Sequence, residues 1–316
     1  MKVYNPKPLA PVAEQMLKDS GVEIVGSSGP TKEDLIKDVA DVDVIVVWLS
    51  PNHIDKEVID AAKKLKLISR FGVGMEIVDV KYAQSKGIMV CNTPFSNINS
   101  VAEHAMYLIM ACARNSRIVD TKMHSGEFNS IKKISAVELE GSTLGIIGLG
   151  NIGKLVAKKA SGFDMNIIAW DPFVKEHPGV EMITDLNELL ERSDFVTLHT
   201  PETPQTIGLI GAEQFKKMKK SAFIINAARG AVIDEAAMIE ALKSGEIAGA
   251  GLDVFEQEPP ADDNPLFSME NVIVSPHNAA LSNGALRAMA MDSAQGITEY
   301  LTGKPVTYPV NKEVLK

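Results

Sequence analysis

The stretch LGIIGLGNIGKLVAKKA, residues 144–160, decides the fold. An apolar run ends at Gly148, and Gly148, Gly150 and Gly153 then complete the pattern G-x-G-x-x-G before a helical segment. In such a pattern the first glycine makes a tight turn, the second lets backbone approach a pyrophosphate, and the third allows close packing of helix on strand. The N–H groups at the start of the helix can receive phosphates. The stretch therefore predicts a dinucleotide-binding strand, turn and helix.

An acidic residue at the end of the next apolar run supports this interpretation. Asp171 lies 23 residues after Gly148 and closes the segment 165–171. A carboxylate there can accept hydrogen bonds from ribose hydroxyls and would repel the additional phosphate of NADP. The pattern thus favours NAD as the cofactor. The alternative is that the glycines serve only helix packing and that Asp171 is incidental.

Apolar runs alternate with helical segments on both sides of this turn. Continuous apolar strands separated by helices indicate parallel sheets that are covered on both faces, so we expect two α/β units, the second beginning near residue 98. A long helical stretch spans 99–119, with Asn99 or Ser100 as its cap. Other helical segments are expected at 55–66, 234–245 and 283–303, and strands at 22–25, 42–49, 66–71, 87–92, 143–148, 165–171, 194–200, 221–228, 249–255 and 271–277.

The composition excludes several classes of protein. A length of 316 residues suggests about two domains of ~150 residues each. The net charge of −9 argues against a nucleic-acid or anionic-membrane binder, and the basic cluster at 216–220 is interpreted as a solvated helix face. The six histidines lie at least 20 positions apart, so no local pair could bind zinc, and no metal site is expected. Two isolated cysteines, with no secretory segment at the N-terminus, indicate a cytoplasmic protein.

A second glycine-containing turn occurs in RFGVGMEI, residues 70–77. Gly72 and Gly74 follow a predicted strand, but the third position of the fingerprint is Ile77. Uncovered backbone N–H groups at such a turn can bind a small carboxylate. The alternative is a tight turn without a ligand.

Three predicted strand ends carry an arginine, acidic residues and a histidine. Arg229 follows one strand, Asp253, Glu256 and Glu258 follow the next, and His277 ends the last. The carboxyl ends of parallel strands meet at one edge of a sheet. A histidine can remove a hydroxyl proton, a carboxylate can orient its ring, and an arginine can bind a substrate carboxylate through two hydrogen bonds. The set suits oxidation of a 2-hydroxy acid, whereas His277 alone would more readily be interpreted as a packed, structural residue.

These residues resemble the D-isomer-specific 2-hydroxyacid dehydrogenases over nearly the whole chain. The resemblance rests on RFGVG, CNTPFSNINSVAEHAM, TLGIIGLGNIG, LHTPETPQT, INAARGAVIDE, GLDVFEQEPP and NVIVSPHNAA, and NTPFSNINSVAE looks most like phosphoglycerate dehydrogenases. It implies a Rossmann NAD domain (98–282) inserted into a flavodoxin-like substrate domain (1–97 plus 283–316). Both would be doubly wound α/β domains with parallel sheets. Family members usually pair as homodimers through the NAD domain, and the stretch beginning near Asn99 is the contact that this implies.

The resemblance also implies functional residues. The catalytic set would be Arg229, Glu258 and His277, with Glu258 rather than Glu256 orienting the histidine. Of the other histidines, His104 is expected in packing or in the dimer interface, and His199 has no acidic partner in sequence. The substrate would be bound by Gly72, Val73, Gly74, Asn97, Arg229 and His277, and NAD by Gly148, Gly150, Asn151, Ile152, Gly153, Asp171, Thr200, Pro201, Ala227, Ala228, Arg229, Asp253, His277 and Ala279.

The substrate is where the resemblance is weakest. Leu49 stands where phosphoglycerate dehydrogenases resembling this chain have an arginine for the phosphate, and His53 would replace that arginine only in part. HNAA replaces the frequent HLGA, and the sequence ends at Lys316, so a short form without a regulatory domain is expected. The first expectation is therefore a phosphoglycerate-dehydrogenase-like enzyme. The alternatives are a reductase of glyoxylate, hydroxypyruvate or another 2-oxo acid, and an NAD(H)-sensing binding protein of the same fold.

Overall fold

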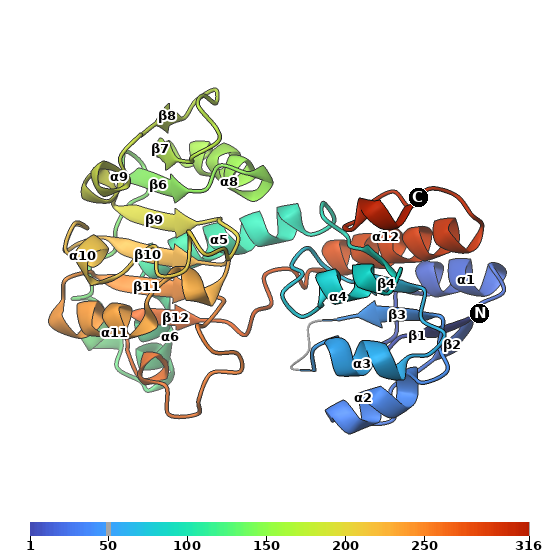
Figure 1. The fold of residues 1–316 in the computed structure, drawn as a ribbon. Coiled ribbons are helices and arrows are strands. Elements are labelled where there is room, and N and C mark those ends of the chain that lie inside the picture. Colours follow the sequence, from blue (N-terminus) through green and yellow to red (C-terminus); the bar gives the residue numbers. More distant parts are fainter. Residues whose placement is uncertain (49–51, 316) are drawn as a thin grey trace. The chain divides into compact units, whose positions relative to one another are not determined.

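The computed structural model describes residues 1–48 and 52–315, and it divides them into two compact units. Unit 1 comprises Met1–Asn97 and Leu281–Lys316, and unit 2 comprises Ile98–Ala280 (Figure 1). Unit 2 is therefore an insertion into the chain of unit 1. Leu49, on which the expectation of a missing phosphate ligand rests, lies outside the described residues.

Unit 1 is built on a five-stranded parallel sheet with the order β2-β1-β3-β4-β5. This is the flavodoxin-like order, in which the winding direction reverses between β1 and β3. All four residues of β3 and of β4 are buried, as expected for strands covered on both faces. The strands are β1 (Lys2–Tyr4), β2 (Glu23–Val25), β3 (Val44–Val47), β4 (Leu67–Arg70) and β5 (Met89–Cys91).

Helices cover both faces of this sheet because alternate strand residues point to opposite sides. Val44 and Val46 pack with the helices of one face, and Ile45 and Val47 pack with those of the other. The first face carries α1 (Pro11–Asp19) and α12 (Asn283–Leu301), and the second carries α2 (Lys32–Val39), α3 (Lys56–Ala61) and α4 (Val80–Ser85). The short helix η3 (Lys312–Leu315) follows α12.

Unit 2 contains a seven-stranded parallel sheet with the order β12-β11-β10-β9-β6-β7-β8. This is a Rossmann-type order, with its topological switch point between β6 and β9. The carboxyl ends of these strands carry most of the residues singled out in the sequence. The strands are β6 (Thr143–Ile147), β7 (Asn166–Trp170), β8 (Glu181–Met182), β9 (Phe195–Leu198), β10 (Phe223–Asn226), β11 (Gly249–Leu252) and β12 (Val272–Val274).

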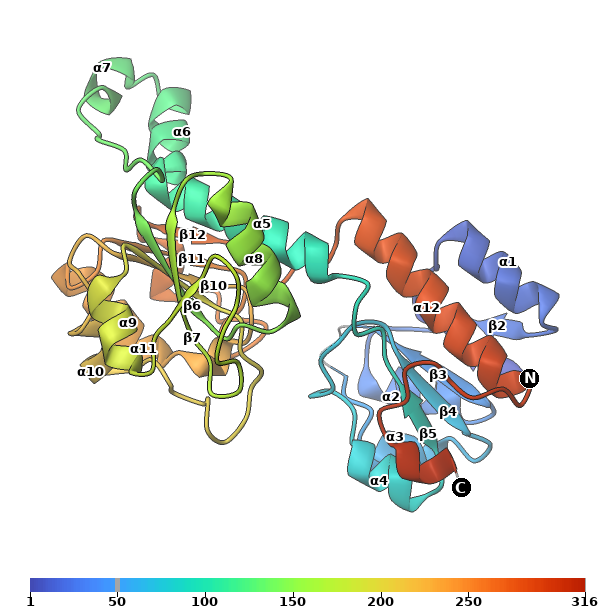
Figure 2. The same ribbon diagram turned by 90° about the horizontal axis from the view of Figure 1, so that it is seen from above.

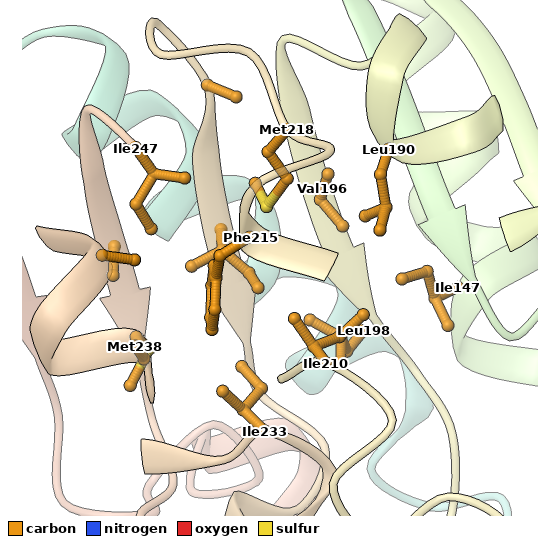
Figure 3. Close-up of a cluster of buried hydrophobic side chains, with 14 of the residues drawn as sticks. Ile147, Leu190, Val196, Leu198, Ile210, Phe215, Met218, Ile233, Met238 and Ile247 are labelled. Carbon is orange, nitrogen blue, oxygen red and sulfur yellow. The ribbon is translucent and has the colours of Figure 1, made fainter. Parts of the chain in front are cut away.

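Two hydrophobic clusters hold the helices of unit 2 against this sheet. On one face, α5 (Ile98–Ala113) and α8 (Asn151–Ser161) pack over β6 and β10. On the other face, α9 (Leu186–Arg192), α10 (Ala212–Phe215) and α11 (Glu235–Ser244) enclose the cluster around Phe215 and Met238 that Figure 3 shows. Two further helices, α6 (Ser116–His124) and α7 (Phe128–Ile131), extend away from the sheet (Figure 2), and η1 (Gly230–Val232) and η2 (Pro265–Phe267) lie in loops.

The predicted fold class, two doubly wound parallel sheets, is confirmed, but three local predictions were wrong. The helix expected at 99–119 is two helices, because Asn115 adopts a left-handed conformation with φ of 51° between α5 and α6. Helix α5 begins at Ile98, so Asn99 and Ser100 lie inside it and do not cap it. The lysines at 216–220 follow α10 instead of forming a helix face.

Two further features concern the cysteines and the lengths of the helices. Cys91 and Cys112 are free and buried, and burial raises the pKa of their thiols to about 11 and about 12, respectively. Both thiols are therefore protonated at neutral pH and are poor nucleophiles. Among the described residues, none of the helices is both long and apolar enough to span a membrane.

Candidate active site

The glycine-rich turn of unit 2 joins β6 to α8 at the switch point of the sheet. Gly148 has φ of +93°, and a Cβ there would lie 2.7 Å from the carbonyl oxygen of His199. A Cβ on Gly153 would lie 2.2 Å from the carbonyl oxygen of Gly148, so helix and turn touch through backbone. A Cβ on Gly150 would meet no described atom within 4 Å. Two of the glycines thus serve packing, and the third leaves open space.

The start of α8 is suited to an anion. Gly150 is the N-cap of this 11-residue helix, and no side-chain hydrogen bond to the cap is formed within the described part of the chain. The first N–H groups of a helix have no partner within the helix itself. Asn151 and Ile152 form its first turn, and Ile152 packs with Val101, Ala227 and Ala279 in one small apolar cluster.

Asp171 is fixed by backbone just after β7. Its Oδ2 accepts a hydrogen bond from the N–H of Leu149 at 2.7 Å, and its Oδ1 accepts from Phe173 at 2.8 Å and Val174 at 3.0 Å. Burial alone would raise the pKa of this carboxyl, but the three N–H donors and the charge of Lys154 hold it below its ordinary value of 3.8. Asp171 is therefore a fixed negative charge beside the glycine turn.

The loop after β9 offers a hydroxyl without a partner. Thr200 Oγ1 is buried and has no hydrogen-bond partner among the described residues, whereas a buried hydroxyl normally has one. Pro201 follows it, and its carbonyl oxygen accepts from Thr206 Oγ1 at 2.7 Å. Burial lowers the pKa of the neighbouring His199 to about 4, so that ring is neutral near pH 7 and is not positioned for acid–base work. The open Gly150, the start of α8 and the Thr200 hydroxyl, which has no partner in the described part of the chain, fit a dinucleotide.

Arg229 follows β10 in an extended conformation with φ of −143°. Asn226 fixes this turn, because its Nδ2 donates to the carbonyl oxygen of Arg229 at 2.9 Å and its Oδ1 accepts from the N–H of Ala228 at 3.0 Å. The guanidinium donates to the carbonyl oxygen of Ala228 at 2.6 Å. The side chain is only partly buried, and its charge contributes to lowering the pKa of Glu258. Arginine and acid are thus close enough to interact electrostatically.

His277 and Glu258 form a direct pair. His277 Nδ1 lies 2.7 Å from Glu258 Oε2, and the N–H of Phe255 donates to Glu258 Oε1 at 3.1 Å. Burial would raise the pKa of the Glu258 carboxyl, but the hydrogen bond and charge of His277, with Phe255 and Arg229, hold it below its ordinary value of 4.5. Glu256 instead accepts a hydrogen bond from the N–H of Glu235, at the start of α11. Of the two glutamates, Glu258 is the one that contacts the histidine.

Asp253, unlike Gly150 at the glycine turn, is closely surrounded by other groups of the protein. Its side chain is 1 % exposed, and it accepts hydrogen bonds from Ser275 Oγ at 2.6 Å and from the N–H groups of Asn278 at 3.0 Å and Ala279 at 2.9 Å. Its carbonyl oxygen accepts from the N–H of His277 at 2.7 Å. Asp253 therefore organises the loop that carries His277, a role that the sequence did not reveal.

In unit 1, neighbouring side chains form hydrogen bonds with the backbone of the turn after β4. The N–H of Gly72 donates to Thr93 Oγ1 at 2.9 Å, so the expectation of an uncovered N–H there was wrong. Arg70 donates to the carbonyl oxygen of Gly74 at 2.9 Å, and Val73 is 39 % exposed. Asn97, at the end of the first segment of unit 1, has a buried Oδ1 without a partner in the described residues. Unit 1 thus has an exposed apolar side chain at this turn and, at Asn97, a buried polar atom that no described residue satisfies.

The comparisons with known proteins agree with this architecture. A sequence model of the D-isomer specific 2-hydroxyacid dehydrogenase NAD-binding domain matches residues 106–279, more than half of the chain. A glyoxylate reductase from Thermofilum pendens is 39% identical, with 100% of this chain and 96% of that protein covered. The crystal structure of the TT0316 protein from Thermus thermophilus superposes with a TM-score of 0.91 at 32% identity, covering 98% of this chain and 100% of that one.

The chain therefore belongs to the D-isomer-specific 2-hydroxyacid dehydrogenase family, and unit 2 contains its NAD(P)-binding domain. Within the family, this chain is also similar to D-3-phosphoglycerate dehydrogenases. The protein of that name from Archaeoglobus fulgidus is 43% identical over 98% of this chain. The chain spans 59% of the length of that relative.

Proposed function

We propose that this chain is an NAD-dependent D-2-hydroxyacid dehydrogenase that interconverts a 2-hydroxy acid and the corresponding 2-oxo acid. The observation that carries the proposal is the 2.7 Å pair between His277 Nδ1 and Glu258 Oε2 in the family's cofactor-binding unit. Nicotinamide, when bound, supplies the hydride acceptor or donor. The catalytic roles given below to the chain's own residues are part of the proposal.

His277 is the general acid and base. Because the Glu258 carboxyl has a lowered pKa, it is an anion at neutral pH and accepts the Nδ1–H of the ring. The other ring nitrogen, Nε2, is then left for the substrate. It accepts the proton of the C2 hydroxyl in oxidation and returns a proton to the C2 oxygen in reduction. Glu258 orients the ring and stabilises the charge that the ring acquires.

Arg229 binds the carboxylate of the substrate and polarises the C2 oxygen. A planar guanidinium can donate two parallel hydrogen bonds to a carboxylate, which fixes the substrate more firmly than an ammonium would. Backbone around Val73 and Gly74, with Gly72 and Asn97, supplies the contacts of unit 1. The buried Oδ1 of Asn97, for which residues 1–48 and 52–315 provide no hydrogen-bond partner, supports its part in this set.

The preferred cofactor is NAD rather than NADP. The proposal rests on Asp171, whose carboxylate is held anionic by three backbone N–H groups beside the glycine turn. An anion in that place accepts hydrogen bonds from ribose hydroxyls and repels a 2′-phosphate. The residues proposed to hold NAD are Gly148, Gly150, Asn151, Ile152, Gly153, Asp171, Thr200, Pro201, Ala227, Ala228, Arg229, Asp253, His277 and Ala279.

Two substrate classes compete at this site. Identity of 43% to a D-3-phosphoglycerate dehydrogenase supports a 2-hydroxy acid with a phosphate group. Leu49 stands where phosphoglycerate dehydrogenases resembling this chain have an arginine, which favours a smaller 2-oxo acid with no phosphate. The glyoxylate reductase from Thermofilum pendens matches over 96% of its length, which supports the second class.

We also propose that the chain forms a homodimer through unit 2 and that the protein is located in the cytoplasm. Exposed apolar side chains on α5 and on the projecting helices support such a contact: Tyr107, Met110, Met123 and Phe128 are all exposed. Burying apolar surface of this kind between two copies is the usual driving force for a stable dimer. The free thiols of Cys91 and Cys112 suit a reducing compartment.

One experiment separates these possibilities. NADH oxidation is followed at its absorbance band with glyoxylate, hydroxypyruvate, pyruvate, a branched 2-oxo acid and 3-phosphohydroxypyruvate as substrates. We expect turnover with at least one of them, and the ratio of kcat/KM for hydroxypyruvate and its phosphate identifies the class. Tight NADH binding without turnover of any of these acids would contradict the proposal and favour an NADH-sensing protein.

A further inference from the structure

A histidine outside the proposed catalytic set lies next to the buried carboxylate that organises the catalytic loop. His104, on α5, has its Nε2 2.9 Å from Ser275 Oγ and 3.5 Å from Asp253 Oδ1. Its side chain is 18 % exposed, and the carboxylate beside it is almost completely buried. The histidine and the serine are separated by 171 positions in the chain, so only the fold brings them together.

The direction of the hydrogen bonds follows from the protons available. Ser275 has one hydroxyl proton, and its 2.6 Å contact with Asp253 Oδ1 is shorter than its 3.4 Å contact with the carbonyl oxygen of Leu252. A carboxylate is also the stronger acceptor, so the proton points to Asp253. Ser275 Oγ then presents a lone pair to His104, and Nε2 of His104 must carry the proton. The chain of donors runs from His104 to Ser275 to Asp253.

The same carboxylate holds the residues on both sides of the catalytic histidine. Asp253 accepts the N–H groups of Asn278 and Ala279 with its side chain and that of His277 with its carbonyl oxygen. His277 itself has φ of 51°, a left-handed conformation that is uncommon and unfavourable outside glycine. Such a conformation persists only where surrounding contacts enforce it. Asp253 makes such contacts with His277 itself and with the two residues that follow it.

We propose that His104 is a positioning residue for the reaction, acting through Ser275 to fix the Asp253 carboxylate and, with it, the loop 275–279 that carries His277. The inference rests on the proposed function for its consequence on turnover. Its consequence for the order of the loop does not depend on that function. Hydrogen bonds in series polarise one another, so loss of the His104 donor weakens the hydrogen bonds that Asp253 accepts from the loop.

The test compares two substitutions at His104. His104→Gln retains an N–H donor at nearly the distance of Nε2, whereas His104→Leu keeps the volume and loses the donor. Hydrogen–deuterium exchange of the amides of residues 277–279, measured on the protein without ligand, reports the loop directly. We expect exchange about tenfold faster in His104→Leu and near that of the wild type in His104→Gln. His124→Leu is the matched control, because the His124 side chain is 80 % exposed on α6.

Turnover gives the second readout. With the 2-oxo acid that the wild type reduces, we expect kcat of His104→Leu to fall about tenfold, with recovery in His104→Gln. Adding His104→Leu to Ser275→Ala is expected to lower kcat little further, because both substitutions break the same chain of hydrogen bonds. Unchanged exchange at 277–279 in His104→Leu, or additive losses in the double variant, would overturn the inference. If the wild type reduces no 2-oxo acid but exchange rises in His104→Leu, the positioning role stands and the proposed function fails.

Discussion

Two glycines where β6 leads into α8, the N-cap Gly150 and Gly153 in the first turn of the helix, give a sharp test of the proposed cofactor site. Gly150→Ala adds a Cβ with no described atom within 4 Å, and its φ of −75° and ψ of −158° are open to alanine. Gly153→Ala adds a Cβ 2.2 Å from the carbonyl oxygen of Gly148. The first change should therefore disturb a bound ligand, and the second should disturb the protein itself.

The magnitudes follow from these contacts. At Gly153, overpacking against backbone costs about 3 kcal/mol, at the upper end of the usual range, and alanine regains about 1 kcal/mol of helix propensity. The net loss of about 2 kcal/mol lowers Tm by roughly 4–8 °C in a domain of this size. At Gly150, the weaker N-cap costs at most about 1 kcal/mol. The Cβ stands where the backbone would meet pyrophosphate, and Kd for NADH should rise about 10–100-fold.

Differential scanning calorimetry and a fluorescence titration with NADH measure the two effects on the same samples. We expect Gly150→Ala to melt within about 4 °C of the wild type and to bind NADH poorly, and Gly153→Ala to melt clearly lower. Wild-type affinity for NADH in Gly150→Ala would refute the placement of the pyrophosphate at this turn. Equal melting temperatures for Gly153→Ala and the wild type would refute the close packing of α8 on β6.

Further predictions concern charge, thiols and assembly. The pKa of Asp171 is lowered in the folded chain, so the stability that it contributes is present above its ordinary pKa of 3.8 and is lost as pH falls through the lowered value. In urea titrations, the free energy of unfolding of Asp171→Asn should therefore depend less on pH in the acid range than that of the wild type. The same substitution should reduce the preference for NADH over NADPH, measured by kcat/KM, by at least about tenfold. The thiols of Cys91 and Cys112 have raised pKa values, so a thiol reagent should label the native protein far more slowly than the unfolded chain at pH 7, which mass spectrometry can follow. Tyr107→Glu places a charge on the exposed apolar surface of α5, and sedimentation should then show monomer where the wild type is a dimer; a wild type that sediments as a monomer would contradict the proposed contact.

The elements that sequence could predict are those with a dense local pattern. Strands such as β3 and β12 are continuous apolar runs, and the expected strands contain all of their residues. β8 was missed because it has only two residues, too few to show a period, and β1 was missed because it contains a single aliphatic residue, Val3. The break at Asn115 was missed because an asparagine in left-handed conformation leaves the apolar pattern of the flanking helices intact.

In the candidate site, too, only residues with a local sequence signal could be predicted. Arg229, Glu258 and His277 could be named because each directly follows a strand or lies within a recognisable motif, and the structure brings Glu258 and His277 to 2.7 Å. The partners of Asp253 and His104 could not be named, because their contacts join residues 22–26 and 171 positions apart without any local signal. Residue chemistry alone did not separate Glu256 from Glu258, which differ by only two positions; the family resemblance implied Glu258, and Glu258 is the one that contacts His277.

The central claim is that His277 exchanges the substrate proton, whereas its contact with the cofactor contributes little to the affinity for NADH. The measurement is the rate of a single turnover in His277→Gln, with enzyme in excess over NADH and with the 2-oxo acid that the wild type reduces best. The account predicts a rate lower by about 10²–10⁴-fold, with Kd for NADH within about threefold of the wild type. A single-turnover rate equal to that of the wild type, at equal occupancy by NADH, would contradict it.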